Sequence, residues 1–169
     1  MVIKPQFDNK ILIISCAVGG LVYGLLMGTA FNNIGAGIAM GIIFGAILAI
    51  VFNLLIKVVL NKAYEKMEKM FDPLRKDMHY LRTIICEGPV SYKDSSIVLG
   101  GWMFLSTDAI EFYSIKGNNN AKNIPILLDD IISVSTNKYN LIIETKETTY
   151  TFIISNRIKD WENCIKNEI

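Results

Sequence analysis

The chain has 169 residues and a formal net charge of +1, and 51% of its residues are hydrophobic. So small a net charge argues against strong electrostatic attraction to nucleic acid, and we expect no nucleic-acid partner. The charge is unevenly placed, because residues 1–83 carry a net charge of +4 and residues 84–169 a net charge of −3. The richness in Ile, Asn and Lys is typical of bacterial genomes of low GC content.

The apolar residues are concentrated near the N-terminus. Residues 11–31 and residues 34–56 contain no charged side chain. At about 1.5 Å of rise per residue, each run is long enough to cross the hydrocarbon core as a helix. Only Asn32-Asn33 separates the runs, so we expect an antiparallel transmembrane hairpin. A cleaved signal peptide is the alternative for the first run, although a second apolar run follows it at once.

The rest of the chain divides around this hairpin. We predict four segments: a cytosolic N-terminus over 1–10, the membrane hairpin over 11–60, an amphipathic juxtamembrane helix or linker over 61–83, and a soluble domain over 84–169.

Lysines flank the two apolar runs on one side only. Lys4 and Lys10 precede the first run, four lysines follow the second, and the link between the runs is uncharged. The positive-inside rule therefore predicts a multi-pass protein of the cell membrane with both termini in the cytosol. The basic residues after the second run are also candidates for contact with anionic lipid headgroups, the alternative being charge that only sets topology. These residues are Lys57, Lys62, Lys66, Lys69, Arg75 and Lys76.

Glycines recur at every fourth position in both apolar runs. Fourfold spacing places them on one face of each helix, where small residues allow the close approach that helix pairing in lipid depends on. We expect the two stripes to pack against each other within one hairpin. Packing between chains, which would make a homo-oligomer, is the alternative. The helix-packing candidates are Gly20, Gly24, Gly28, Gly37, Gly41 and Gly45.

The linker carries an apolar stripe with alternating spacings of four and three, as in a heptad repeat. Its members are Leu60, Tyr64, Met67, Phe71, Leu74, Met78 and Leu81. One interpretation is a short dimerising stalk. The other is an amphipathic helix that lies against the headgroups or against the chain's own soluble domain. Asp72-Pro73 predicts that one helix ends near Phe71 and another begins at Pro73, because Asp is a good N-cap and Pro suits the first helical position.

The pattern from Thr83 onward changes to short segments rich in β-branched and aromatic residues. They predict seven strands, at 84–86, 97–99, 103–105, 110–113, 131–136, 141–145 and 149–154. Turn signals separate them at Gly88-Pro89, Gly100-Gly101, 117–120 and 137–140. Ser155-Asn156 then favours a helix cap, and residues 157–169 place their apolar side chains on one helical face. We expect an α+β domain, a small seven-stranded β-barrel or sandwich capped by a C-terminal helix.

The sequence from Gly101 to Ser114, GWMFLSTDAIEFYS, resembles the signature hairpin of GRAM domains, which belong to the pleckstrin-homology-like superfold. Ile124-Pro125-Ile126 and Asp130-Ile131 resemble the elements that follow in that family, and Trp161 matches the aromatic residue of its C-terminal helix. The resemblance covers about half the chain, from residue 84 onward. It implies a pleckstrin-homology-like fold for the soluble domain.

The departures from the GRAM pattern bear on the ligand. Asp108-Ala109 stands where the family commonly has Asn and a basic residue, and the loop after Tyr92 offers only Lys93 as a cation. Members of the superfold that bind phosphoinositides use clustered basic residues in that loop, because several phosphate charges need several donors. Without such a cluster, the resemblance favours a protein partner, with lipid as a second ligand class.

Catalytic patterns are missing from the sequence: we find no nucleophile beside a base and no phosphate-binding loop. The three cysteines are widely spaced and odd in number, which predicts reduced thiols and neither a disulfide framework nor a metal site. Asp129-Asp130 fits a solvated turn better than acid–base chemistry. We therefore expect no enzyme and no cofactor.

Two functions remain open. The first is a membrane-anchored, non-catalytic adaptor that presents its soluble domain at the cytosolic membrane face. The alternative is a membrane oligomer, a scaffold or small pore, assembled through the glycine stripes and regulated by the soluble domain.

Overall fold

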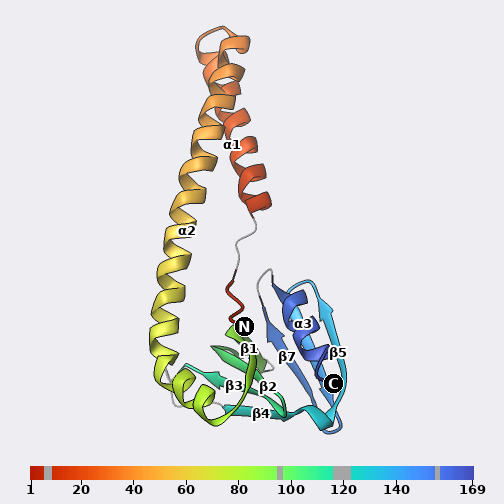
Figure 1. The fold of residues 1–169 in the computed structure, drawn as a ribbon. Helices are drawn as coiled ribbons and strands as arrows, with labels where there is room; N and C mark the ends of the chain where they lie inside the picture. The colour runs from red at the N-terminus through yellow and green to blue at the C-terminus, as the bar shows by residue number, and fades with distance from the viewer. Residues whose placement is uncertain (6–8, 95–96, 116–122, 155–156) are drawn as a thin grey trace. The chain divides into compact units, whose positions relative to one another are not determined.

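The computed structural model describes residues 1–5, 9–94, 97–115, 123–154 and 157–169. The chain forms two compact units: Phe7–Glu65, the hairpin unit, and Met1–Gln6 together with Lys66–Ile169, the soluble unit. Figure 1 shows the helices and strands along the chain. The turn expected at 117–120 and the cap expected at Ser155-Asn156 lie outside the described residues.

The hairpin unit consists of α1 (Asn9–Ala30) and the first part of α2 (Ile34–Leu81). Asn32 takes a left-handed φ of 48°, which Asn tolerates better than most residues, and the side-chain oxygen of Asn33 accepts a hydrogen bond from the N–H of Ala36 at 3.1 Å. The two asparagines therefore end one helix and cap the next. This local chemistry makes the tight connection that the sequence predicts.

Both helices are long and apolar enough to cross a membrane. Only 22% of the most apolar window of α1 and 6% of that of α2 is buried within the molecule. The core helices of soluble proteins bury their apolar faces, whereas here most apolar side chains point outward. This exposure is what a lipid environment requires.

The prediction that a helix ends near Phe71 is wrong, because α2 continues through Pro73 to Leu81. Proline in a helix interior removes one backbone hydrogen bond. The loss is tolerated here because residues on both sides of Pro73 make tertiary contacts in the soluble unit: Phe71 and Met78 are both buried. Local helix-breaking chemistry is overridden by packing.

The soluble unit contains a seven-stranded antiparallel sheet in the order β4-β3-β2-β1-β7-β6-β5. β1 pairs with β2 along its whole length but with β7 only at 91–93, so it joins one meander, β1–β4, to a second, β5–β7. The C-terminal helix α3 packs against β5, β6 and β1. This is the pleckstrin-homology-like architecture that we expected. The elements are β1 (Ile84–Asp94), β2 (Ile97–Ser106), β3 (Ala109–Ser114), β4 (Asn123–Leu127), the 3-10 turn η1 (Leu128–Asp130), β5 (Ile131–Asn137), β6 (Asn140–Thr145), β7 (Thr149–Ile153) and α3 (Ile158–Lys166).

Two predicted turns are parts of strands. Gly100-Gly101 lies inside β2, so the strands predicted at 97–99 and 103–105 are one strand. Position 101 requires glycine for a close approach and not for a turn, because a Cβ there would come within 2.6 Å of the Phe112 ring on β3. Gly88-Pro89 lies inside β1. Pro89 falls between the residues of β1 that pair with the N-terminal segment and those that pair with β7, so its missing N–H is not needed for pairing. The turn predicted at 137–140 is confirmed, with Lys138 at a φ of 54°.

The main core lies between the sheet and α3. Ile158, Trp161 and Ile165, three of the residues predicted on the apolar face of the last helix, are buried in it, and Cys164 packs against it. Aromatic residues of the strands, among them Tyr92, Phe112 and Phe152, contact one another there. The predicted helix is thus confirmed as the element that closes the core.

Candidate functional site

The outer face of the sheet is the face of β1–β3 that is turned away from the main core. Trp102 and Phe104 lie on it, while the alternating residues Met103 and Leu105 belong to the main core. Trp102 is 0% exposed and Phe104 is 1% exposed. A second layer of protein must therefore cover this face. The cross-strand partners that complete it are Glu87, Pro89, Glu111 and Tyr113.

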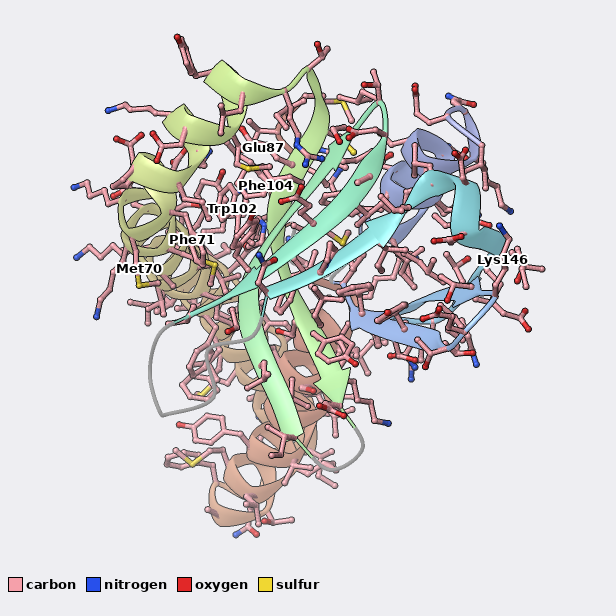
Figure 2. The ribbon with its side chains drawn as sticks, turned by 90° about the horizontal axis from the view of Figure 1, so that it is seen from below. Met70, Phe71, Glu87, Trp102, Phe104 and Lys146 are labelled. Atoms are coloured by element: carbon pink, nitrogen blue, oxygen red, sulfur yellow. The ribbon has the colours of Figure 1, made fainter. Side chains whose placement is uncertain are left out.

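Residues 66–81 of α2 form the covering layer. The ring centroids of Phe71 and Trp102 lie 5.8 Å apart, and Figure 2 shows Phe71 beside Trp102. The hydroxyl oxygen of Tyr113 lies 3.8 Å from the sulfur of Met78. Of the two interpretations of the heptad stripe, these contacts support a helix that packs on the chain's own domain.

Glu87 is the polar centre of this contact. Its carboxylate, on a residue that is 1% exposed, accepts hydrogen bonds from Arg75 at 2.6 and 3.0 Å and from the indole N–H of Trp102 at 3.2 Å. Nε2 of His79 lies 3.2 Å from the same carboxylate. The Arg75 guanidinium also binds Glu68 at 3.1 Å and lies 5.3 Å from the centroid of the Trp102 ring. A buried carboxylate needs such paired charge and donors, so this network ties α2 to β1.

Burial is the largest single influence on the pKa of Glu87, and it raises that pKa. The hydrogen bonds from Arg75, His79 and Trp102, together with the charge of Arg75, lower it and outweigh burial. The pKa of Glu87 therefore lies below the ordinary value of 4.5. Glu87 is ionised at neutral pH, and its pair with Arg75 is a true ion pair.

A second cluster lies at the end of α2. Arg82 binds Asp108 at 3.0 Å and Glu111 at 2.9 Å, and Tyr113 donates to Glu111 at 2.5 Å. Burial first, then the hydrogen bond to Glu111 and its charge, raise the pKa of Tyr113 to about 12. Asp108, which departs from the GRAM pattern, also accepts a hydrogen bond from Ser106 at 2.6 Å. The acidic turn thus holds the arginine that follows α2.

Residues 1–3 make a third contact with the sheet. Val2 forms a parallel bridge with Glu87, whose N–H donates to the carbonyl of Met1 at 2.9 Å and whose carbonyl accepts from the N–H of Ile3 at 2.7 Å. Ile3 is 2% exposed and belongs to the main core. Glu87 therefore binds the segment before α1 through its backbone and the end of α2 through its side chain.

The glycine stripes face each other within the hairpin unit. A Cβ on Gly24 would lie 2.6 Å from the carbonyl oxygen of Gly37, and one on Gly20 would lie 2.5 Å from that of Gly41. Gly28 and Gly45 meet the opposite backbone in the same way. Gly19, outside the stripe, would meet nothing within 4 Å. The geometry is that of two backbones in direct contact.

The basic residues after the second apolar run fall into two groups. Lys57, Lys62, Lys66, Lys69 and Lys76 are exposed on α2. Arg75 is different, because its side chain is 16% exposed and its guanidinium is engaged by Glu87 and Glu68. We therefore leave Arg75 out of the candidates for headgroup contact. Its partner on β1 is distant in sequence, which is why the run of basic residues did not separate it from the lysines.

Sequence reasoning missed Ile3, Glu87 and Trp102 as members of one site. One signal was available: the run from Trp102 to Leu105 is apolar at every position. A strand that is apolar on both faces is buried on both faces. That run therefore predicts that another segment packs on the outer face, although it does not identify the segment.

No family model matches this chain, and no curated protein matches it. Among solved structures, it is similar to the C-terminal domain of an unknown protein from Leishmania infantum, with 15% identity and a TM-score of 0.45, over 60% of this chain and 92% of that one. It is also similar to the N-terminal PH domain of human ARAP2, with 17% identity and a TM-score of 0.42, over 48% of this chain and 76% of that one. A pleckstrin homology domain solved in solution matches with 22% identity and a TM-score of 0.41, over 51% and 85%. Likenesses this weak carry no argument about function, so the fold assignment rests on strand order and the closing helix.

Proposed function

We propose that this protein is a membrane-tethered, non-catalytic adaptor, in which the helical hairpin holds the pleckstrin-homology-like domain at the cytosolic face of the cell membrane for a protein partner. One observation carries the proposal. Residues 1–3, before α1, and residues 66–81, at the end of α2, belong to the same folded unit and both bind Glu87. Segments of one folded unit lie on one side of a membrane, so two spans between them must cross it and return.

The charges support the cytosolic side. Lys4 and Lys10 precede α1 or lie in its first turn, and the exposed lysines of α2 follow the second apolar run. The connection at Asn32-Asn33 carries no charge. By the positive-inside rule, the flanks stay in the cytosol and the connection is translocated.

We also propose that the soluble unit is of the GRAM type. The residues that carry the resemblance form the β2–β3 hairpin, with its turn at Thr107-Asp108. The Ile-Pro-Ile run lies in β4, and Trp161 is fully buried on α3. These positions maintain the core and turns, so they support a fold type and name no ligand.

Lipid contact is proposed for the exposed lysines of α2 alone. Each basic residue near an anionic surface contributes about 1 kcal/mol to membrane attraction. Replacing Lys62, Lys66, Lys69 and Lys76 together by Gln in the full chain should weaken the binding of detergent-solubilised protein to anionic nanodiscs. The difference should shrink as salt rises, because screening removes it. If the unchanged chain and the four-fold Gln variant bind equally at low salt, these lysines do not contact lipid headgroups and serve only to set the topology.

The glycine-zipper oligomer is less well supported than the adaptor. In the hairpin unit, the glycines of each stripe contact the backbone of the other helix of the same chain. A second chain would have to displace that contact before it used the same face. The geometry therefore favours a stripe that serves the hairpin itself.

Topology is tested by cysteine labelling in intact cells. In a chain whose three cysteines are replaced by Ala, Asn33→Cys should react with an impermeant maleimide from outside. Lys138→Cys, in the exposed β5–β6 turn, should react only after lysis. External labelling at 138 overturns the cytosolic placement and, with it, the adaptor.

The partner is tested by cross-linking from native membranes with the full chain and with a chain ending at Glu65. The cut at Glu65 follows the boundary of the units, so it does not leave the apolar face of residues 66–81 uncovered. Proteins captured by the full chain alone would be partners of the soluble unit. If both chains capture the same proteins, the hairpin is the binding element and the adaptor proposal fails.

A further inference from the structure

Among the described strands, none but β2 pairs with the first half of β1, which leaves one of its edges to the N-terminal segment. β2 pairs with β1 from Ile84 to Asp94, but on the opposite side β7 reaches only Ser91–Lys93. Residues 85–88 would therefore present unpaired backbone groups along that side. The N-terminal segment fills this position through its bridge at Glu87.

The contact combines backbone pairing with one side-chain pocket. The backbone of Glu87 exchanges two hydrogen bonds with the segment, at 2.9 Å with Met1 and 2.7 Å with Ile3. The side chain of Ile3 enters the main core. Gly88 allows this approach, because a Cβ there would lie 2.5 Å from the carbonyl oxygen of Ile3 and 3.5 Å from the ring of Trp161 on α3. β1 and α3 thus form the two walls of the site.

The segment is held by a short contact. Ile3 is its one buried residue, Val2 is partly exposed, and Lys4 and Pro5 are exposed. Pro5 has no N–H to donate, so the ladder cannot continue along it. The segment is otherwise held by hydrogen bonds of its first three residues to Ile85 and Glu87. Ordering each residue costs conformational entropy, which offsets much of this gain, so we expect the contact to be reversible.

We propose that the edge of β1 at 85–88 and the Ile3 pocket form a strand-binding site, occupied at rest by the chain's own residues 1–3 and open to an extended peptide of a partner protein when they leave. The partner segment pairs through its backbone, which any sequence can do, and inserts an aliphatic residue where Ile3 lies, which gives specificity. This inference deepens the proposed adaptor function, because it names where its soluble unit would take a protein ligand.

The test uses the full chain in detergent and a fluorescent peptide of residues 1–5, Met-Val-Ile-Lys-Pro, as the probe. Ile3→Asp should expel the resident segment, because a carboxylate in the main core has no partner, and leave the site empty. This variant should bind the peptide at least about tenfold more tightly than the unchanged chain, whose own segment competes. A peptide with Asp in place of Ile should not bind either protein.

Two glycine substitutions provide matched controls. Gly88→Ala combined with Ile3→Asp should abolish peptide binding, since the added methyl occupies the space of the Ile3 carbonyl. Gly100→Ala combined with Ile3→Asp should bind normally, because the nearest atom to its Cβ would be a side-chain carbon of Ile115 at 3.6 Å. Failure of folded Ile3→Asp to bind the peptide, or equal binding of both peptides, overturns the proposal.

Hydrogen exchange on the unchanged chain tests reversibility without any variant. The amides of Ile3 and Glu87 should exchange at least about tenfold faster than the amides of the central strand residues Leu141 and Phe152. Equal protection of the two sets would mean that the segment does not leave, and the proposal would fail. Since neither measurement depends on membrane topology, their failure would leave the anchoring by the hairpin standing.

Discussion

The hairpin unit and the soluble unit are each stabilised internally by a different kind of contact. In the hairpin unit, the glycine stripes of α1 and α2 bring backbone against backbone, with the stacked rings of Tyr23 and Phe44 beside them. In the soluble unit, the contacts are made by the largest side chains, with Trp102, Trp161 and Phe104 almost fully buried. Lipid supplies no hydrophobic drive to pair helices, so close approach is what stabilises them, whereas in water the burial of large apolar side chains is the main driving force.

Removing the buried carboxylate of the soluble unit should have the largest effect. Glu87→Ala removes the buried carboxylate that binds Arg75 and Trp102 and should lower the free energy of unfolding of this unit by about 3–5 kcal/mol. Tryptophan fluorescence during urea unfolding reports it, because Trp102 donates to Glu87. Glu147→Ala, in an exposed turn, is the control and should change stability by less than about 0.5 kcal/mol. Similar losses for both variants would remove Glu87 from its central position.

Enlarging one glycine of the stripe should destabilise the hairpin unit. In Gly24→Leu, the added side chain would collide with the backbone at Gly37 and Gly41, at a cost of about 3 kcal/mol. We expect a lower thermal stability in detergent. Gly19→Leu makes the same change five residues earlier on α1, where the space is open, and should leave stability unchanged. If the two variants behave alike, the stripe is not the packing face.

A glycine of the soluble unit should respond in a different way, because its neighbour is an aromatic ring. Gly101→Ala brings a methyl within 2.6 Å of the Phe112 ring and against the backbone of β3, at a cost of about 1–3 kcal/mol. Gly100→Ala is the adjacent control and should be tolerated. The measurement is urea unfolding followed by circular dichroism. Equal tolerance at both positions would contradict the close approach of β2 and β3.

Acidification should weaken the soluble unit through Glu87. Because the pKa of Glu87 is lowered on folding, the folded state binds its proton less tightly than the unfolded state does. Its contribution to stability is fully present above the ordinary pKa of 4.5 and is lost as pH falls through the lower folded value. The free energy of unfolding should therefore decline below about pH 4.5. In Glu87→Gln, this part of the decline should be absent.

The smallest effect is expected at an ion pair on the same helix as Arg75. Lys76 binds Asp72 at 2.7 Å, but their side chains are 76% and 47% exposed. Exposed pairs of this kind contribute about 0.5 kcal/mol or less. Asp72→Ala should therefore leave the urea midpoint of the soluble unit almost unchanged. A loss of unfolding free energy comparable to that of Glu87→Ala would show that the face of α2 around Asp72 is buried by other residues.

The elements that sequence reasoning predicted well depend on neighbouring residues alone. The apolar runs of α1 and α2, the asparagine connection between them, the β5–β6 turn and the buried face of α3 each follow from local composition or periodicity. The alternation and turn signals of the second half were sufficient for a β domain with a closing helix. The strands themselves were not all predicted: two predicted strands are the single strand β2, and β4 was not among the seven. Local chemistry decides such elements because their own hydrogen bonds and apolar faces are completed within a few residues.

The remaining features were decided by contacts between residues far apart in the chain. Glycine suits a turn and a close approach equally well, so only the position of β3 reveals that Gly101 belongs to a strand. Pro73 ends an isolated helix but not one fastened on both sides, and Arg75 is a surface cation until Glu87 is placed beside it. Ile3, the third residue of the chain, becomes a core residue because it lies beside the exposed edge of the described part of β1. Composition alone distinguishes the apolar hairpin from the soluble unit. The contacts that join the N-terminal segment, α2 and β1 at Glu87 arise only from tertiary structure. No local pattern encodes the pairing of Val2 with a residue more than eighty positions away.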